Sequence, residues 1–375
     1  MPTGRRREPD ELREGLARWV AAHPDVPPVA VGGREPAPPN PAVVGLAHAT
    51  SGLANETVLL ELGDGHPGLA VRLPPLEPTF PHYDLRTQAT VQNAVASAGV
   101  PAPAPALAVD DPQWIGTPFL VMPRVVGHIP GPAPLFDPWI ADAGVARQRA
   151  VHTALVDTLV AVHAVDWAGL GLGGVLPGPS CRDALEYWSE YVQWATEGSP
   201  TPALADALAW CAGTVPDPVP DPDHDGGGGA PVLVWGDPRL GNLVFADDLS
   251  VRAVLDWELA AIGPAGMDLG WFLGLESMMD ELFGRAVPGF APREDTMSRY
   301  TRATGRALDE DTMAWHEIFA LVRALSVNER QQRVAAASGR RYVGGTPARD
   351  PEADPLARVL RAKVQARSSR ERPSP

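Results

Sequence analysis

Residues Val232 to Trp271 read VLVWGDPRLGNLVFADDLSVRAVLDWELAAIGPAGMDLGW, and this stretch decides how the rest of the chain is interpreted. It opens on a short apolar run that predicts a buried strand, and it continues into a polar loop that holds Asp237 and Asn242. Two short apolar runs around a polar turn follow, and such a pair predicts a hairpin. The sequence therefore predicts a polar loop held between a buried strand and a hairpin.

The predicted hairpin brings polar residues together at its open end. With the turn centred near Leu249, Asn242 is expected to face Asp256, and facing residues have Cβ atoms about 5 Å apart. Amide and carboxylate oxygens at that spacing suit Mg²⁺. Asp237 stands in the same loop, and a carboxylate beside such a metal is what phosphoryl transfer requires. Any one of these residues alone would be interpreted as a turn cap, but the set together favours a metal-assisted reaction.

The two polar motifs resemble those of a known family. They are WGDPRLGN (Trp235–Asn242) and DWE (Asp256–Glu258). They resemble the H-G-D-x-x-x-x-N and D-x-[DE] strings of the phosphotransferase family that includes aminoglycoside phosphotransferases and choline kinases, whose fold is like that of protein kinases. The resemblance covers roughly residues 43–330. It implies that Asp237 is the catalytic base and that Asn242 and Asp256 hold Mg²⁺.

Three further residues lie in or near these motifs. Arg239, inside the loop, is expected either to steady Asp237 or to contact phosphate, and a solvated loop arginine is the alternative. Glu258 follows the metal-binding aspartate closely enough to line an acceptor pocket. Asp268, in the DLGW string, is interpreted as a structural hydrogen-bond acceptor.

The resemblance extends to the first part of the chain. It implies that Ser51 and Gly52 lie in the turn that covers the nucleotide phosphates and that Arg72 takes the place of the phosphate-pairing lysine. Gln88 falls near the position of the glutamate that usually pairs with that lysine. Met122 belongs to the hinge whose backbone groups hold adenine. The implied cofactors are ATP (or GTP), bound between the two lobes, and Mg²⁺.

Four strings place the chain near one branch of this family. That branch is bacterial, is assigned to the aminoglycoside phosphotransferases, and resembles the kinase-like module attached to some acyl-CoA dehydrogenases. The strings are SGLANET (Ser51–Thr57), VRLPP (Val71–Pro75), GTPFLVMPRVVG (Gly116–Gly127) and WGDPRLGN (Trp235–Asn242).

Three departures from the family pattern leave an alternative open. Trp235 stands where the family has histidine, Lys363 is the only lysine of the chain, and Gln88 replaces an acidic residue. The alternative is a catalytically weak or inactive nucleotide-binding module. A metal-dependent phosphatase would use similar carboxylates, but it would not need a β-rich first lobe with a hinge.

Composition limits the functions that remain. The chain has 375 residues and a net charge of −15, which argues against a general nucleic-acid-binding or anionic-membrane surface. It contains no apolar run long enough to span a membrane and no secretory signal, so a cytoplasmic protein is expected. Its two cysteines cannot form a disulfide framework, and both are expected to be buried.

The expected partners are a nucleotide and a small hydroxylated molecule, with no protein partner indicated. An aminoglycoside and a hydroxylated acyl compound both remain open as acceptors.

The predicted fold class is α+β, a bilobal protein-kinase-like fold with a small β-rich N-lobe and a larger helical C-lobe. Residues 1–41 are expected to form a helix (9–22) and a Pro-rich connection, and residues 42–125 the nucleotide-binding N-lobe. Residues 126–365 are expected to form the helical C-lobe with the catalytic loop and metal site, and residues 366–375 a disordered tail. The low-complexity segment 213–230 is expected to be a disordered surface loop.

Overall fold

The structure, a computed structural model, describes residues 6–24, 42–49, 55–63, 65–178, 180–216, 230–339 and 354–370. Ser51, Gly52 and most of the low-complexity segment therefore lie outside the described residues. The chain divides into two compact units, Met1–His128 with Val244–Glu258, and Ile129–Leu243 with Leu259–Pro375. The segment 244–258 thus groups with the first unit, although it lies within the stretch 126–365 that the sequence places in the second lobe.

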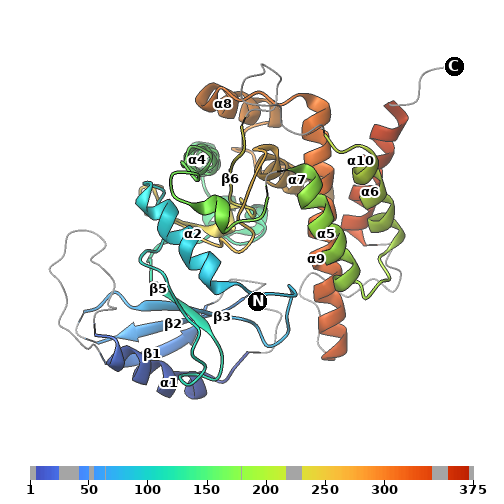
Figure 1. Ribbon diagram of the computed structural model, residues 1–375. Coiled ribbons are helices and arrows are strands. Elements are labelled where there is room, and N and C mark those ends of the chain that lie inside the picture. Colours follow the sequence, from blue (N-terminus) through green and yellow to red (C-terminus); the bar gives the residue numbers. More distant parts are fainter. Residues whose placement is uncertain are drawn as a thin grey trace. The chain divides into compact units, whose positions relative to one another are not determined.

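The first unit is built on a five-stranded antiparallel sheet in the order β1-β2-β3-β5-β4 (Figure 1). Its strands are β1 (Val43–His48), β2 (Glu56–Leu62), β3 (Leu69–Leu73), β4 (Leu107–Val109) and β5 (Phe119–Pro123). Val58 pairs with Val71, which in turn pairs with Val121, so apolar side chains line up across three strands. Strands β2 and β3 pair antiparallel as a hairpin.

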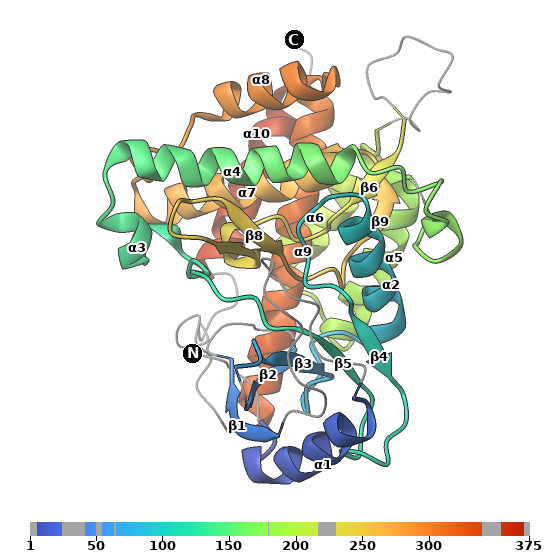
Figure 2. The same cartoon turned by 90° about the vertical axis from the view of Figure 1, so that its left-hand side faces the viewer.

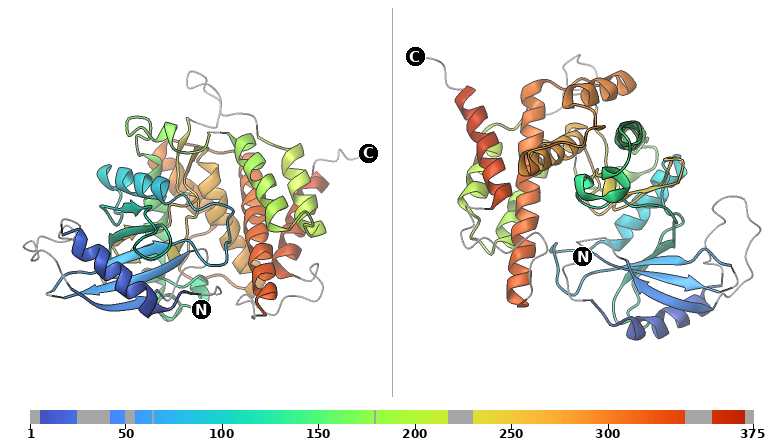
Figure 3. Two further views of the ribbon diagram at one scale, coloured as in Figure 1. Left: turned by 60° about the horizontal axis from the view of Figure 1, so that its bottom comes forward. Right: turned by 180° about the vertical axis from the view of Figure 1, so that it is seen from behind.

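Helix α1 (Pro9–Ala22) covers one face of this sheet (Figure 3). Its side chains Leu12, Leu16 and Trp19 recur at helical spacing and are buried against the sheet residues of the same core cluster. Helix α2 (Leu85–Ser97) packs on the other face, where its N-cap Asp84 accepts a 2.9 Å bond from the amide of Thr87. The position of α2 brings Gln88 to the sheet residue Arg72.

The first unit also holds most of the hairpin formed by β7 (Leu243–Phe245) and β8 (Val251–Val254). The amide of Ala246 donates to the carbonyl of Ser250 at 2.9 Å, so the turn is centred one residue earlier than predicted. Leu249 has a φ of 70° and Asp256 a φ of 66°, and Asp256 lies beyond the end of β8. The cross-strand argument that made Asn242 and Asp256 facing partners is therefore wrong in its register.

The second unit is mainly helical, and it confirms the predicted division into a small β-rich part and a larger helical part. Its main elements are α3 (Pro138–Ala141), α4 (Val145–His163), α5 (Cys181–Ala195), α6 (Pro202–Gly213), β6 (Val232–Val234), β9 (Ala261–Gly263), α7 (Gly266–Phe283), α8 (Arg293–Thr304), α9 (Glu310–Ala337) and α10 (Pro355–Arg370). Strands β6 and β9 pair antiparallel. Helix α10 continues to Arg370, beyond residue 365, where the sequence places the start of the tail.

Helix α9 is the central helix of the second unit, and α5, α6, α7 and α10 pack against it (Figure 2). Helix α7 approaches it through Gly266, Gly270 and Gly274, which are spaced four residues apart and so lie on one face. A Cβ atom on Gly270 would lie 2.5 Å from the Cβ of His316, closer than real carbon atoms approach. The glycines therefore let the two helix backbones come together, which fixes the place of the side chains on both helices.

Both cysteines are free and buried, as expected, on α5 and α6 of the second unit. Within the described parts of the chain, no helix has the length and apolar character needed to cross a membrane.

Candidate active site

The catalytic loop predicted from the sequence follows strand β6. Gly236 has a φ of 93°, and a Cβ on it would lie 2.2 Å from the carbonyl oxygen of Leu259. Both facts require glycine here, because L-residues rarely adopt that conformation and a side chain would clash. A short 3-10 turn (Leu240–Asn242) then returns the chain so that Asn242 reaches Asp237.

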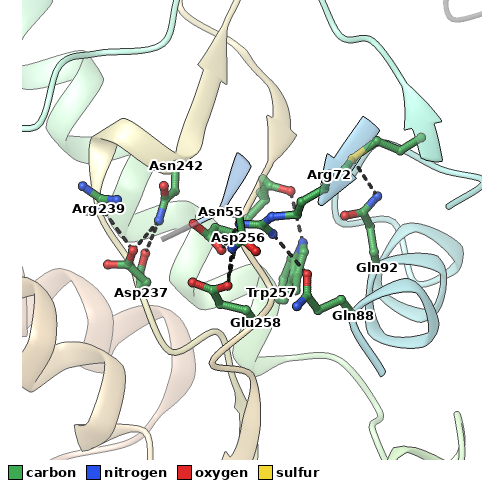
Figure 4. Close-up of polar contacts among 12 residues, drawn as sticks. Asn55, Arg72, Gln88, Gln92, Asp237, Arg239, Asn242, Asp256, Trp257 and Glu258 are labelled. Carbon is green, nitrogen blue, oxygen red and sulfur yellow. Dashed lines mark hydrogen bonds and ion pairs between the residues drawn. The ribbon is translucent and has the colours of Figure 1, made fainter. Parts of the chain in front are cut away.

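The Asp237 carboxylate is held by donors on both of its oxygens. Trp271 Nε1 donates to Oδ1 at 2.7 Å, whereas Arg239 Nε and Asn242 Nδ2 donate to Oδ2 at 2.9 and 2.8 Å. Figure 4 shows Arg239 and Asn242 converging on this carboxylate. The side chain is 15% exposed, so the carboxylate is oriented by the protein and still open to solvent. Arg239 thus contacts Asp237, one of the two arrangements expected for it.

A buried carboxylate anchors the start of the loop. Asp268 is fully buried and accepts hydrogen bonds from the backbone amides of Trp235 and Gly236 at 2.7 and 2.8 Å. His163 Nε2 lies 3.0 Å from the same carboxylate, and its Nδ1 lies 2.7 Å from the hydroxyl of Tyr300. This confirms that Asp268 is a structural acceptor, and it explains how the loop is fixed although its first residue is tryptophan.

Sequence reasoning missed two side chains that contact this loop. Trp271 follows Asp268 by three residues, so one helical turn puts both on the same face of α7, and that spacing was the available signal. Arg323 on α9 donates from Nη2 to the carbonyl of Gly236 at 2.8 Å across 87 residues of sequence. Nothing local in the sequence points to so distant a contact.

In the first unit, Arg72 on β3 is the centre of a second polar cluster (Figure 4). Its Nη2 lies 2.6 Å from Asp256 Oδ1 and 4.0 Å from Glu258, and its Nη1 donates to Gln88 Oε1 at 3.3 Å. Burial disfavours the charge, but Asp256 and Glu258 outweigh it, so the pKa of Arg72 is raised. The acidic partner that Gln88 does not provide is supplied by the D-W-E motif.

The remaining predicted residues of the first unit lie around this cluster. Glu258 accepts a hydrogen bond from Asn55 Nδ2. Met122 is a buried residue of β5 that pairs with Ala70 of β3, and its sulfur lies 3.5 Å from Gln92 Nε2. The structure therefore brings Arg72, Gln88, Asp256 and Glu258 together and separately brings Asp237, Arg239 and Asn242 together.

The donor atoms of these residues fit Mg²⁺. Asn242 uses its amide nitrogen to bind Asp237, so its amide oxygen is the atom that can ligate a cation, and Asp256 offers carboxylate oxygens. Both are hard oxygen ligands of the kind that Mg²⁺ prefers. In the described ranges no group of three His, Cys, Asp or Glu side chains is placed to hold a metal. Neither residue alone supplies a full set of ligands, so a cation held by either would complete its shell with water and substrate oxygens, as Mg²⁺ usually does.

A pocket of about 830 Å³ opens beside the catalytic loop within the second unit, and Pro238, Arg239 and Leu240 form part of its wall. Its apolar lining includes Leu135, Leu155, Phe272, Met279, Phe283 and Phe290. Its charged lining residues are three acids (Glu276, Asp280 and Glu281) and three arginines (Arg239, Arg285 and Arg293). The wall is thus largely apolar and close to neutral in formal charge.

Comparison with known proteins places these features in a family. Residues 46–316 match the family model described as "Phosphotransferase enzyme family". The human acyl-CoA dehydrogenase family member 11 is 31% identical over 278 residues, which is 70% of this chain and 33% of that protein. The chain therefore matches about a third of the length of this curated relative.

Solved structures share the fold. A Ralstonia eutropha protein assigned to the aminoglycoside phosphotransferases has a TM-score of 0.67 at 21% identity, covering 94% of this chain and 98% of its own. A ternary complex of a thermostable mutant of aminoglycoside phosphotransferase APH(4)-Ia with ADP and hygromycin B has a TM-score of 0.52 at 14% identity, covering 89% and 96%. These structural likenesses show that the chain has the protein-kinase-like fold. Because the family model matches most of the sequence, the chain belongs to the phosphotransferase enzyme family.

Proposed function

We propose that the protein transfers the γ-phosphate of ATP, or GTP, to the hydroxyl group of a small molecule. Asp237 accepts the hydroxyl proton, and Mg²⁺ is held by Asn242 and Asp256. The observation that carries the proposal is the Asp237 carboxylate, which three side-chain donors orient while 15% of its side chain stays exposed. A fixed carboxylate that can still reach an acceptor is what a base in phosphoryl transfer needs.

Arg72 is the residue proposed to hold the nucleotide phosphates. Its planar guanidinium can form paired hydrogen bonds to phosphate, and its neighbours Asp256 and Glu258 keep it charged. The nucleotide assignment is supported by the related APH(4)-Ia structure, which contains ADP. When bound, Mg²⁺ would neutralise charge on the phosphates, while the chain's own residues orient the acceptor and take up its proton.

The pocket beside Arg239 is proposed to receive the acceptor. A site for a polycationic aminoglycoside is expected to carry an excess of acidic side chains, but the acids and arginines of this wall balance. Its apolar residues instead favour an acceptor with an apolar body, which agrees with the hydroxylated acyl compound left open by the sequence. The match to acyl-CoA dehydrogenase family member 11 supports the same choice.

A nucleotide-binding module without turnover is the second candidate. The ion pair between Arg72 and Asp256 at 2.6 Å favours it, because each residue already has a partner that nucleotide binding would have to displace. The charge of Arg72 is already compensated by Asp256 without a nucleotide, and this candidate therefore predicts weak nucleotide binding.

The test combines ATP consumption with thermal denaturation. The wild-type protein is assayed for ATP consumption with Mg²⁺ over aminoglycosides, hydroxylated acyl compounds and short polyols, and its melting temperature is measured with and without ATP–Mg²⁺. We expect turnover with an apolar-bodied alcohol and a Mg²⁺-dependent rise in melting temperature. Asp256→Ala should remove that rise, whereas Asp247→Ala, an exposed carboxylate on the same hairpin, should retain it. Binding without turnover on any acceptor would favour the inactive module instead.

A further inference from the structure

We propose that Trp271 and Arg323 form a positioning pair that sets the carboxylate of Asp237 for proton transfer. The proposal rests on the proposed function, since it assigns Asp237 the role of base. It concerns two buried side chains on different helices, α7 and α9, that contact two consecutive residues of the loop.

Trp271 controls the orientation of the carboxylate. Its indole Nε1 lies 2.7 Å from Asp237 Oδ1, and the other oxygen is bound by Arg239 and Asn242. An indole can only donate, so the bond requires Asp237 to present an acceptor at that oxygen. The indole is neutral, so it orients the carboxylate without adding a second positive charge to the one that Arg239 already places 2.9 Å from Oδ2. The indole ring is itself held at only 7% exposure.

Arg323 controls both the indole and the backbone before Asp237. Its guanidinium carbon lies 4.4 Å from the ring centroid of Trp271 and 4.9 Å from that of Trp188. Its Nη2 donates to the carbonyl of Gly236 at 2.8 Å. One rigid guanidinium therefore packs on the ring that binds the carboxylate and also holds the peptide that leads into Asp237.

The cost of burying Arg323 supports a role beyond stability. The residue is only 3% exposed, and within the described residues its Nε has no hydrogen-bond partner. Burial lowers its pKa to about 10, against the opposing pull of Asp268 and Asp237, so it stays charged at neutral pH. A buried cation that lacks full hydrogen bonding is costly, and a core position would be served better by an apolar side chain.

Kinetics test the indole bond through Trp271→Phe, which keeps an aromatic ring for Arg323 but removes the donor. We expect kcat to fall by about 10- to 100-fold with KM for ATP changed less than about twofold, because only proton transfer is affected. The matched control is Trp315→Phe, which removes another buried indole bond, to the carbonyl of Cys211 at 3.0 Å. It should lower the melting temperature at least as much and leave kcat unchanged. Equal kcat values for Trp271→Phe and wild type would overturn the proposal.

Nuclear magnetic resonance gives a readout that does not depend on turnover. The indole ¹⁵N–¹H signal of Trp271, assigned by its absence in Trp271→Phe, should move in Asp237→Asn. The Trp315 signal should stay in place in the same variant. Arg323→Met should shift the Trp271 signal, and Arg323→Lys should restore it only in part, because lysine lacks the planar fork. A Trp271 signal that ignores Asp237→Asn would overturn the proposal, whereas absence of turnover with this coupling intact would count against the proposed function alone.

Discussion

At the scale of single residues, Arg72 shows how a largely buried cation can take its partners from a distant part of the sequence. The family resemblance predicts that it replaces a phosphate-pairing lysine, and its acidic partners come from the D-W-E motif at 2.6 Å (Asp256) and 4.0 Å (Glu258). Arginine and lysine are not equivalent at such a position, because the guanidinium is planar and forms several directed bonds. The side chain of Gln88 completes the contact with a neutral bond at 3.3 Å.

His316 gives a prediction for the dependence of stability on pH. Burial, and then the nearby charge of Arg323, lower its pKa from the ordinary 6.5 to about 3. Between these values the unfolded chain binds a proton that the native chain does not, so the free energy of unfolding falls as the pH falls. The slope from this one group reaches about 1.4 kcal/mol per pH unit. Chemical denaturation of wild type and His316→Met from pH 7 to pH 4 should show that the variant loses this part of the slope; parallel curves would contradict the assignment.

Residue contacts also show where sequence reasoning ends. The spacing of Asp237 and Asn242 predicted that they act together, and the structure joins them by a 2.8 Å hydrogen bond. The only sequence signal for Trp271 was its three-residue spacing from Asp268, and the role of Arg323 could not be predicted, because it depends on a distant helix packing against the loop. The metal and nucleotide roles of the site residues stay predictions.

At the scale of elements, the approach of α7 to α9 determines where the site residues stand. Asp268 and Trp271 come from α7, and Arg323 comes from α9. The glycines at 266, 270 and 274 allow this approach, and a shift of either helix would move several contacts of the catalytic loop at once. Stability and site geometry are therefore expected to be coupled here.

Gly270→Ala tests that coupling. The added methyl group would meet the backbone and Cβ of His316 at 2.5 Å, so we expect a loss of about 1–3 kcal/mol in unfolding free energy from overpacking. Gly213→Ala is the control, because this glycine ends α6 with no atom within 4 Å of an added Cβ. Alanine is the better helix former, so the control should be neutral or slightly stabilising. Denaturant titration of both variants gives their free energies of unfolding. Equal values for Gly270→Ala and Gly213→Ala would contradict the close approach of α7 to α9.

Most elements could be predicted from the sequence because their apolar periodicity is strong. Helix α1 (Pro9–Ala22) has the predicted bounds, and strand β6 (Val232–Val234) lies where the apolar run predicts a strand. The hairpin register was wrong because Leu249 adopts a left-handed backbone conformation, with φ 70°, that its residue type does not announce. Helix α10 runs past residue 365 because its polar end still forms helix to Arg370.

At the scale of the whole molecule, the residues of the proposed reaction are divided between the two units. Arg72, Asp256 and Glu258 belong to the first, and Asp237 and Asn242 to the second. A ligand that binds the native state but not the unfolded chain stabilises the native state by a free energy that grows with the logarithm of its concentration above Kd, which is the basis of the thermal test.

The two thiols report on the second unit. Cys181 and Cys211 are 7% and 0% exposed, and burial raises the pKa of Cys181 to about 12 and that of Cys211 as well. Because the thiolate is the reactive form, neither should react with a disulfide reagent at pH 8 in the native protein. Denaturation should expose both thiols to the reagent. At low denaturant concentration, the rate of labelling should follow the opening of this unit. Rapid labelling of the native protein would contradict the buried positions of α5 and α6.

The most direct test of the central claim is phosphoryl transfer by Asp237→Asn. Asparagine keeps the size of the side chain but cannot accept the hydroxyl proton as a carboxylate does. With the acceptor that the wild-type protein phosphorylates best, we expect transfer from γ-labelled ATP to fall by about 10²- to 10⁴-fold. Because both oxygens of Asp237 accept hydrogen bonds, the amide leaves at least one donor unpaired, so we expect the melting temperature to fall modestly and its rise with ATP–Mg²⁺ to remain. Transfer at the wild-type rate in this variant would contradict the account.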